Sequence, residues 1–95
     1  MEIRKTETFS DWMDTLTDLR GRARIQARIE RLAAGHPGDA KPVGGKVSEL
    51  RIDAGPGCRV YYTQRDRALI LLLVGGDKST QSADIRLAQR IAQNL

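Results

Sequence analysis

The stretch VSELRIDAGPGCRVYYTQ, residues 47–64, decides the fold because it joins two alternating segments through a strong turn. Apolar and polar residues follow a period of two before and after AGPG, residues 54–57, whose glycines and proline are typical of turns. We therefore predict a β-hairpin. The side chains that would face the core are Leu50, Ile52, Val60 and Tyr62.

The opposite face of this hairpin carries Arg51, Arg59 and Tyr61. Two residues that pair across the hairpin lie on the same face of the sheet, so for the apolar residues of both strands to share a face, the numbers of each pair must add up to an even value. A sum of 110 places Arg51 opposite Arg59, and a sum of 112 places Arg51 opposite Tyr61 and Asp53 opposite Arg59. Like charges directly opposite each other destabilise a sheet unless an anion bridges them. The two arginines are therefore candidates for phosphate binding, or else solvated residues or partners of Asp53 and Glu49.

The rest of the chain is predicted by working outward from the hairpin. ALILLLV, residues 68–74, is apolar throughout, as expected for a strand covered on both faces or central in the sheet. A final helix, capped by Ser79 or Thr80, extends to the end of the sequence. The N-terminal half is predicted to contain a strand at 2–8 and a helix at 11–19 capped by Ser10. A second helix is predicted to begin after Gly21 and to end at Gly35, followed by a loop at 35–45.

This order, βααβββα, predicts an α+β fold with four strands, and we expect residues 1–95 to form one domain. Sixteen Lys and Arg against twelve Asp and Glu give a net charge of +4, which favours a polyanionic partner. The single cysteine, Cys58, cannot form an internal disulfide, and no apolar run approaches the length of a membrane span. We expect a cytoplasmic protein without a membrane partner.

LLLVGGDKSTQ, residues 71–81, contains the ingredients of a phosphate-binding P-loop: a strand, glycines, a lysine and hydroxyl residues. The spacing excludes a nucleotide site, because the positions that require glycine are Asp77 and Leu72. What is left is a helix N-terminus beside Lys78, which can bind a single phosphate. The alternative is that Gly75 and Gly76 only let a strand turn into a helix.

Metal-independent RNA cleavage requires a base for the 2′-hydroxyl, an acid for the leaving oxygen and cations for the developing charge. One histidine, His36, excludes a two-histidine mechanism. Lys, Arg, Tyr and a carboxylate are the groups that are left. Cys58 is expected to be a small packed strand residue, and the acids form no tight cluster, so we expect no metal and no cofactor.

The blocks VSELRIDAGPGCRVYY and LLLVGGDKSTQSADIRLA together resemble the RelE/ParE superfamily of bacterial toxins, and most closely its HigB-like "addiction module killer protein" branch. The resemblance implies a RelE-like fold in which two N-terminal helices pack on a mostly antiparallel four-stranded sheet beside a C-terminal helix. It also implies a toxin of a type II toxin-antitoxin system that cuts mRNA on the ribosome without a metal. Its partners would be the ribosome, mRNA and a cognate antitoxin, commonly a small helix-turn-helix protein, with DNA contacted only through the antitoxin.

Carried over by position, the resemblance assigns catalytic roles to Arg51, Arg59 and Lys78. Tyr61, Thr80 and Lys46 are expected to contact the substrate. Cys58 stands where the family commonly has an aromatic residue after GPG.

Three functions are consistent with these observations. The first is a ribosome-dependent mRNA endoribonuclease, in which the cations bind the scissile phosphate. The second is a ParE-like inhibitor of DNA gyrase, which would be a binding protein on the same fold. The third is an inactive relative that acts only as a repressor partner.

Overall fold

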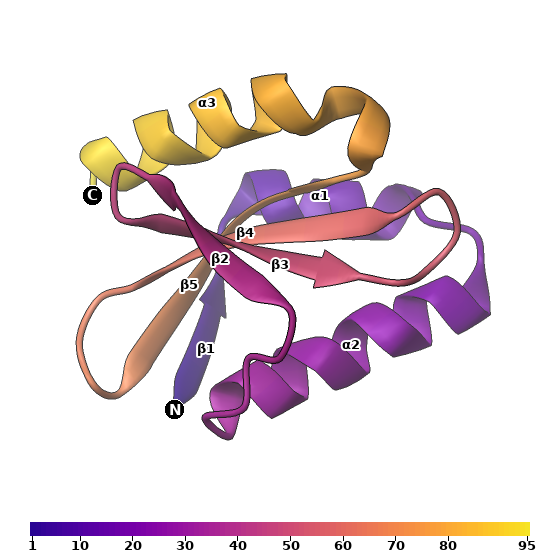
Figure 1. The fold of residues 1–95 in the computed structure, drawn as a ribbon, viewed down its shortest axis with the longest axis horizontal. Coiled ribbons are helices and arrows are strands. Elements are labelled where there is room, and N and C mark those ends of the chain that lie inside the picture. Colours follow the sequence, from indigo (N-terminus) through magenta and orange to yellow (C-terminus); the bar gives the residue numbers. More distant parts are fainter.

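A computed structural model, which describes residues 1–95 throughout, contains three α-helices and five strands (Figure 1). It confirms the α+β class, with two N-terminal helices and a C-terminal helix. The elements in chain order are β1 (Glu2–Lys5), α1 (Glu7–Thr15), α2 (Leu19–Ala33), β2 (Ala40–Gly44), β3 (Val47–Ile52), β4 (Cys58–Gln64), β5 (Leu69–Gly76), the 3₁₀ turn η1 (Lys78–Thr80) and α3 (Gln81–Gln93).

The sheet has the strand order β1-β5-β4-β3-β2, one strand more than we predicted. β1 pairs in parallel with β5, and the other neighbours are antiparallel. The additional strand, β2, lies in the segment predicted to be a loop. It lies at the edge of the sheet, and its pairing with β3 shifts between Pro42 and Gly44. An edge strand tolerates proline because its outward side needs no ladder hydrogen bond.

Both N-terminal helices begin earlier than predicted. The Thr6 hydroxyl accepts a hydrogen bond from the Phe9 amide, so Thr6, and not Ser10, caps α1. Asp18 caps α2 through the Arg20 amide, which places Gly21 inside the helix and leaves Leu19 exposed. These side chains act as caps because they satisfy amides that have no partner within the helix. None of the helices has the length and apolar character needed to cross a bilayer.

The β3–β4 hairpin has the register in which Arg51 lies opposite Arg59, the first of the two alternatives. The predicted core face is also confirmed. Its four side chains, Leu50, Ile52, Val60 and Tyr62, are buried in one cluster with residues of α1 and α2. The turn between the strands depends on glycine, because Gly55 and Gly57 have φ values of +52° and +90°.

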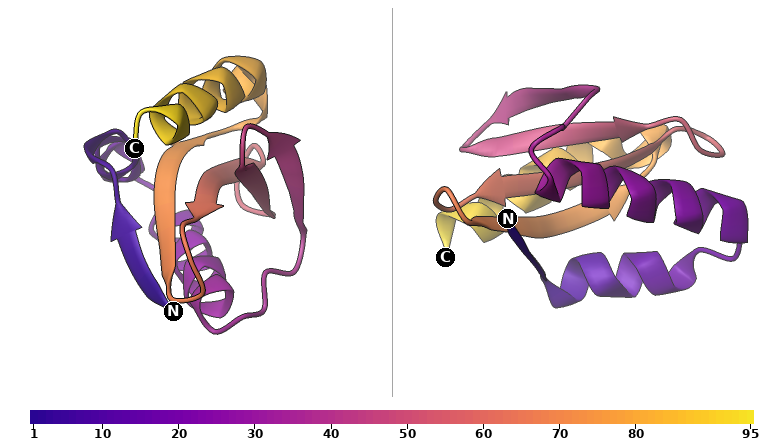
Figure 2. Two further views of the ribbon diagram at one scale, coloured as in Figure 1. Left: turned by 90° about the vertical axis from the view of Figure 1, so that its left-hand side faces the viewer. Right: turned by 90° about the horizontal axis from the view of Figure 1, so that it is seen from below.

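A second apolar cluster lies on the opposite face of the sheet, under α3. It contains Val47, Tyr61, Leu73, Val74 and Ala88. Figure 2 shows the sheet lying between α3 and the pair formed by α1 and α2. The prediction of a strand covered on both faces is therefore confirmed for residues 70–74, whereas Ala68 is exposed and precedes β5. The face that carries Arg59 is largely covered as well.

Gly75 and Gly76 are the last residues of β5 and allow two close contacts. A Cβ atom on Gly75 would overlap the indole ring of Trp12 in α1. A Cβ atom on Gly76 would overlap the carboxylate of Asp84 in α3. The two glycines thus let helices approach opposite faces of the strand, and neither has a positive φ.

Candidate functional site

Arg51, Arg59 and Lys78 border one hollow, although they come from β3, β4 and η1. Its volume is about 310 Å³, and it lies where the β3–β4 turn meets the corner between β5 and α3. Asp39 and Asp53 contribute carboxylates to the same hollow. The structure therefore brings the three predicted cationic residues together and adds two acids beside them.

Arg51 is the more accessible of the two hairpin arginines. Its side chain is 48% exposed, and its Nε lies 3.9 Å from a carboxylate oxygen of Asp39. An ion pair this exposed contributes little to stability and is readily exchanged for another anion. Lys78 is exposed and forms no salt bridge. Arg51 and Lys78 are thus the cations of the hollow that are available to a ligand.

Arg59 is buried and already paired. Its Nε lies 3.2 Å from Oε1 of Glu49, and its Nη1 donates a hydrogen bond of 3.0 Å to the carbonyl of Gly57. Its side chain is only 8% exposed. Arg59 is therefore the arginine that pairs with Glu49, as one of the alternatives stated. Because of this pair, its charge is already largely neutralised in the absence of a phosphate ligand.

The burial of Glu49 was not predicted from the sequence. Its side chain is completely buried, and Oε1 accepts hydrogen bonds from Gln81 at 2.7 Å and from the Tyr61 hydroxyl at 3.4 Å. Nζ of Lys41 lies 3.9 Å from Oε2, which has no hydrogen-bond partner. Because Gln81 begins α3, this carboxylate ties the helix to the strand that carries Arg59.

Tyr61 was expected to contact the substrate, but the structure does not place it on an open face. The residue has no exposed surface, because α3 packs over it. Burial, and then the nearby Glu49 carboxylate, raise the pKa of the Tyr61 phenol well above its ordinary value. In this structure Tyr61 cannot stack on a base, and it positions Glu49 instead.

The corner after β5 also differs from the predicted phosphate-binding helix end. The Asp77 carboxylate accepts hydrogen bonds from the Ser79 amide at 2.8 Å and the Ser79 hydroxyl at 2.5 Å. These bonds, and then the charge of Arg59, hold the pKa of Asp77 below its usual range. The Ser79 amide is therefore satisfied by the protein itself, and Lys78 alone offers a free cation here.

Thr80 and Lys46 lie outside the hollow. The Thr80 hydroxyl donates a hydrogen bond of 2.5 Å to Asp84, and its backbone precedes α3. Lys46 lies in the turn between β2 and β3, at the opposite end of the hairpin from Arg51. The structure therefore does not bring these two predicted substrate-contacting residues together with the three cations.

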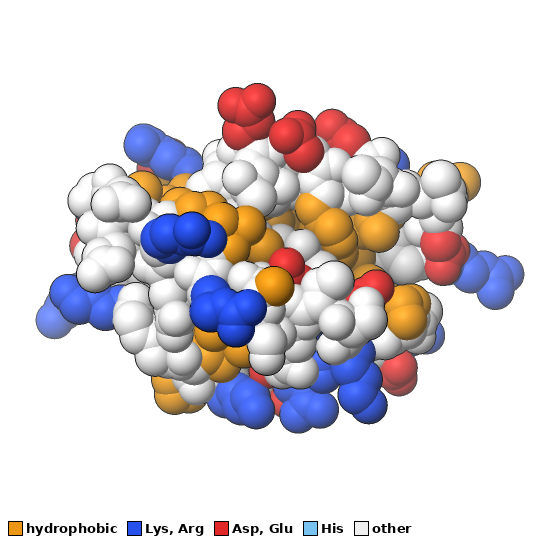
Figure 3. All heavy atoms as spheres, turned by 90° about the horizontal axis from the view of Figure 1, so that it is seen from above, with side chains coloured by type: hydrophobic (Ala, Val, Ile, Leu, Met, Phe, Trp, Pro, Cys, Tyr) orange, Lys and Arg blue, Asp and Glu red, His pale blue; other side chains and the backbone are white.

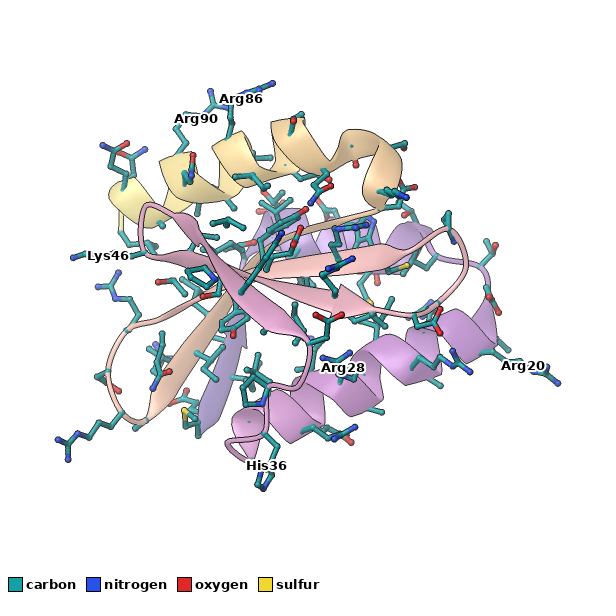
Figure 4. The ribbon with its side chains drawn as sticks, in the orientation of Figure 1. Arg20, Arg28, His36, Lys46, Arg86 and Arg90 are labelled. Atoms are coloured by element: carbon teal, nitrogen blue, oxygen red, sulfur yellow. The ribbon has the colours of Figure 1, made fainter.

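The structure also shows where two further reactive side chains, those of Cys58 and His36, lie. Cys58 borders the hollow but is mostly buried, and burial raises the pKa of its thiol, with smaller contributions from Asp77 and Asp18. A raised pKa disfavours the nucleophilic thiolate. His36 is exposed in the segment after α2 and points away from the sheet (Figure 4).

Arginines of α2 fix the rim of the hollow, a role that the sequence did not indicate. Arg28 donates hydrogen bonds of 2.6 Å to the Arg51 carbonyl and 2.8 Å to the Pro37 carbonyl. Arg24 donates to the Asp53 carbonyl. These bonds hold the end of β3 and the segment before β2 against one helix. They set where Arg51 and its neighbouring carboxylates stand.

The fold is consistent with the RelE/HigB-like toxin fold group. Within that group, a family model of phage-derived Gp49-like proteins (DUF891) matches residues 11–95. The chain is also 48% identical over 95 residues to a Haemophilus influenzae protein described as "Uncharacterized protein", covering 100% of this chain and 96% of that one. The chain belongs to the Gp49-like family.

This membership corrects the family inferred from the sequence motifs. The Gp49-like family is distinct from RelE/ParE, so the placement in the HigB-like branch of RelE/ParE was wrong. The segments ELRID, GPG, RVYY and GGDKSTQ, on which that placement was based, form the β3–β4 hairpin and the corner between β5 and α3.

Proposed function

We propose that this protein is the toxin of a toxin-antitoxin pair and that it cleaves mRNA on the ribosome. The observation that carries the proposal is the hollow, where two accessible cations from different elements, Arg51 and Lys78, meet beside carboxylates. Two cations that border one small cavity suit a single phosphate group. The toxin fold group to which the Gp49-like family belongs supports the same role.

The chemistry follows from the groups at the hollow. The 2′-hydroxyl oxygen forms a bond to phosphorus, and its proton passes to a carboxylate. The bond from phosphorus to the 5′ oxygen breaks as that oxygen takes a proton from solvent water, and the protonated carboxylate then returns its proton to the solvent. Arg51 and Lys78 stabilise the charge that develops on the phosphate oxygens. Asp39 is paired with Arg51, whereas the side chain of Asp53 has no hydrogen bond or ion pair. We therefore assign the proton acceptor to Asp53.

The test is induction of the protein in bacteria that lack an antitoxin. The wild type should arrest growth, and primer extension should show discrete mRNA cuts that depend on translation. Arg51→Ala, Lys78→Ala and Asp53→Asn should remain folded and lose both effects. Arg31→Ala, which removes an exposed arginine from α2, is the matched control and should behave as the wild type. Undiminished arrest by a folded Arg51→Ala/Lys78→Ala protein would rule out this site.

Inhibition of DNA gyrase is the second candidate, and one observation favours it. The hollow contains no histidine, the side chain that most often acts as a general acid or base, and no tyrosine, since Tyr61 is buried and His36 lies elsewhere. Intact mRNA after induction, together with inhibition of gyrase supercoiling by the purified protein, would support this function and exclude the nuclease.

The proposed partner is a small helix-turn-helix antitoxin, and the proposed setting is the cytoplasm. A toxin with this activity must be silenced in the cell that makes it. Co-expression with the neighbouring reading frame tests this directly. The two proteins should co-purify, and growth should resume.

A further inference from the structure

A second basic surface lies at the other end of the hairpin from the hollow. Lys46 precedes β3 and Arg51 lies near its end, so five residues of strand separate them by roughly 16 Å. We call this surface the α3 basic face. It is defined by Lys46, Arg65, Gln89 and Gln93 around an open cavity of about 860 Å³, and by Arg86 and Arg90, which border an adjoining cavity of about 360 Å³ with the same two glutamines.

The cations of this face are unpaired, in contrast to Arg51 and Arg59 at the hollow. None of the four basic side chains takes part in a salt bridge or a side-chain hydrogen bond. No Asp or Glu side chain borders either cavity. The acids nearest in sequence are engaged elsewhere: Asp66 accepts from the Ala68 amide, and Asp84 accepts from Thr80. No Asp or Glu side chain is therefore paired with a positive charge of this face.

The arrangement is suited to an extended anion. Arg86 and Arg90 are four residues apart, so they lie side by side on the outer surface of α3, and Lys46 lies below the C-terminal end of that helix (Figure 4). In Figure 3, which looks down on α3, basic side chains stand on the helix. A group of acidic side chains lies along the border formed by α1, and further acidic atoms are visible nearer the middle of this view. Gln89 and Gln93 add amide groups that can donate to phosphate and sugar oxygens.

Lys46 has a backbone conformation that does not favour lysine. Its φ is +64°, the only positive value outside glycine, and it follows Gly44 and Gly45, which are also left-handed. Gln89 packs on this turn and donates a hydrogen bond of 3.0 Å to the Val43 carbonyl, which holds the turn against α3. Glycine or asparagine would adopt this conformation more readily. The lysine side chain is thus held outward beside the cavity at some cost to the backbone.

We propose that the α3 basic face binds the phosphodiester backbone of a nucleic acid, separately from the hollow. The inference rests on the proposed function and deepens it, because the RNA substrate would have a second contact at the other end of the hairpin from the hollow. A chain held at both places would be fixed in orientation before its phosphate enters the hollow. Such contacts position a nucleic acid without reading its sequence.

The test measures binding of a short fluorescent single-stranded RNA, and of DNA with the same sequence, by the purified full chain over a range of salt concentrations. Arg86→Gln/Arg90→Gln should bind at least about tenfold more weakly near 100 mM salt, and its slope of log K against log salt should be smaller by about 1.4, roughly 0.7 per phosphate contact. Lys46→Gln/Arg65→Gln should show a similar loss. The matched control is Arg20→Gln/Arg31→Gln, which removes the same charge from α2, where Arg20 points away from the molecule (Figure 4).

The outcomes separate this inference from the proposed function. A larger loss on RNA than on DNA assigns the face to RNA, and equal losses assign it to any phosphodiester backbone. Binding equal to that of the wild type, or an equal loss in the α2 control, would overturn the inference. Absence of growth arrest by the wild-type protein would instead contradict the proposed toxin, because the binding measurement does not depend on toxicity. All variants change exposed side chains, and circular dichroism verifies that they fold.

Discussion

Arg51 and Arg59 lie directly opposite each other in the β3–β4 ladder, and each has its own carboxylate partner. Glu49 holds Arg59 at 3.2 Å in the interior, and Asp39 stands 3.9 Å from Arg51 at the surface. This division reduces the repulsion that two facing arginines would otherwise cause. It also gives them different roles, since Arg59 belongs to the frame of the hollow and Arg51 can meet a ligand.

Replacing Glu49 tests the buried pair. Glu49→Ala leaves Arg59 as a buried cation without its partner, so the free energy of unfolding should fall by about 3–5 kcal/mol in urea denaturation. Glu49→Gln should cost less, because the amide oxygen still accepts from Gln81. Glu30→Ala, on the exposed surface of α2, should stay within about 0.5 kcal/mol of the wild type. A Glu49→Ala protein as stable as this control would show that the pair contributes nothing.

Tyr61→Phe separates a structural role from a chemical one. The substitution keeps the packing under α3 and removes only the hydroxyl that donates to Glu49 at 3.4 Å, so the free energy of unfolding should fall by about 1 kcal/mol. Growth arrest should be unchanged, because the side chain does not reach the hollow. Loss of toxicity in a protein that is otherwise as stable as expected would place Tyr61 in the reaction.

How much the sequence could reveal is clearest at Tyr61. The alternation of apolar and polar residues in the hairpin correctly predicted that Leu50, Ile52, Val60 and Tyr62 face the core. The opposite face, which carries Tyr61, was expected to be open to a ligand or to solvent. The contrary signal was present: residues 68–74 are apolar on both sides, and the final helix has an apolar stripe to cover the second side. Combining these two observations would have predicted that Tyr61 and Glu49 are buried.

Other differences had no comparable signal. Thr6 and Ser10 are both good caps, and only the approach of the chain to β5, where the Thr6 hydroxyl also donates to the Leu73 carbonyl, selects the first. The strand β2 contains Pro42 and Gly44, which are typical of loops, and it forms through pairing with β3 and not through local preference. The three cations of the hollow were predicted from the hairpin face and the strand-to-helix corner, and the resemblance indicated the same residues. Their different accessibility depends on side chains distant in sequence.

Gly75→Ala tests the close approach of α1 to β5. The new methyl group would overlap the Trp12 ring, so the helix must shift, and the free energy of unfolding should fall by about 1–3 kcal/mol. Trp12→Leu removes the obstructing ring. In a double-mutant cycle the two changes should therefore cost less together than the sum of their separate effects. If the two changes in the free energy of unfolding simply add, the contact with Trp12 is not what prevents a larger side chain at residue 75.

Asp77→Asn tests the cap of the corner through its pH dependence. Hydrogen bonds from Ser79 lower the pKa of Asp77 in the folded state, so its ionised form stabilises the protein above the unfolded pKa of about 3.9 and this contribution is lost as pH falls through the lower folded value. At pH 7 the variant should have a lower Tm than the wild type, and the difference should shrink at pH values below about 4. Ser79→Ala, which removes the hydroxyl donor, should reproduce part of the loss at pH 7. A Tm difference that is the same at pH 7 and at acidic pH would contradict the assigned role of the Asp77 charge, since an uncharged effect of the substitution would not titrate.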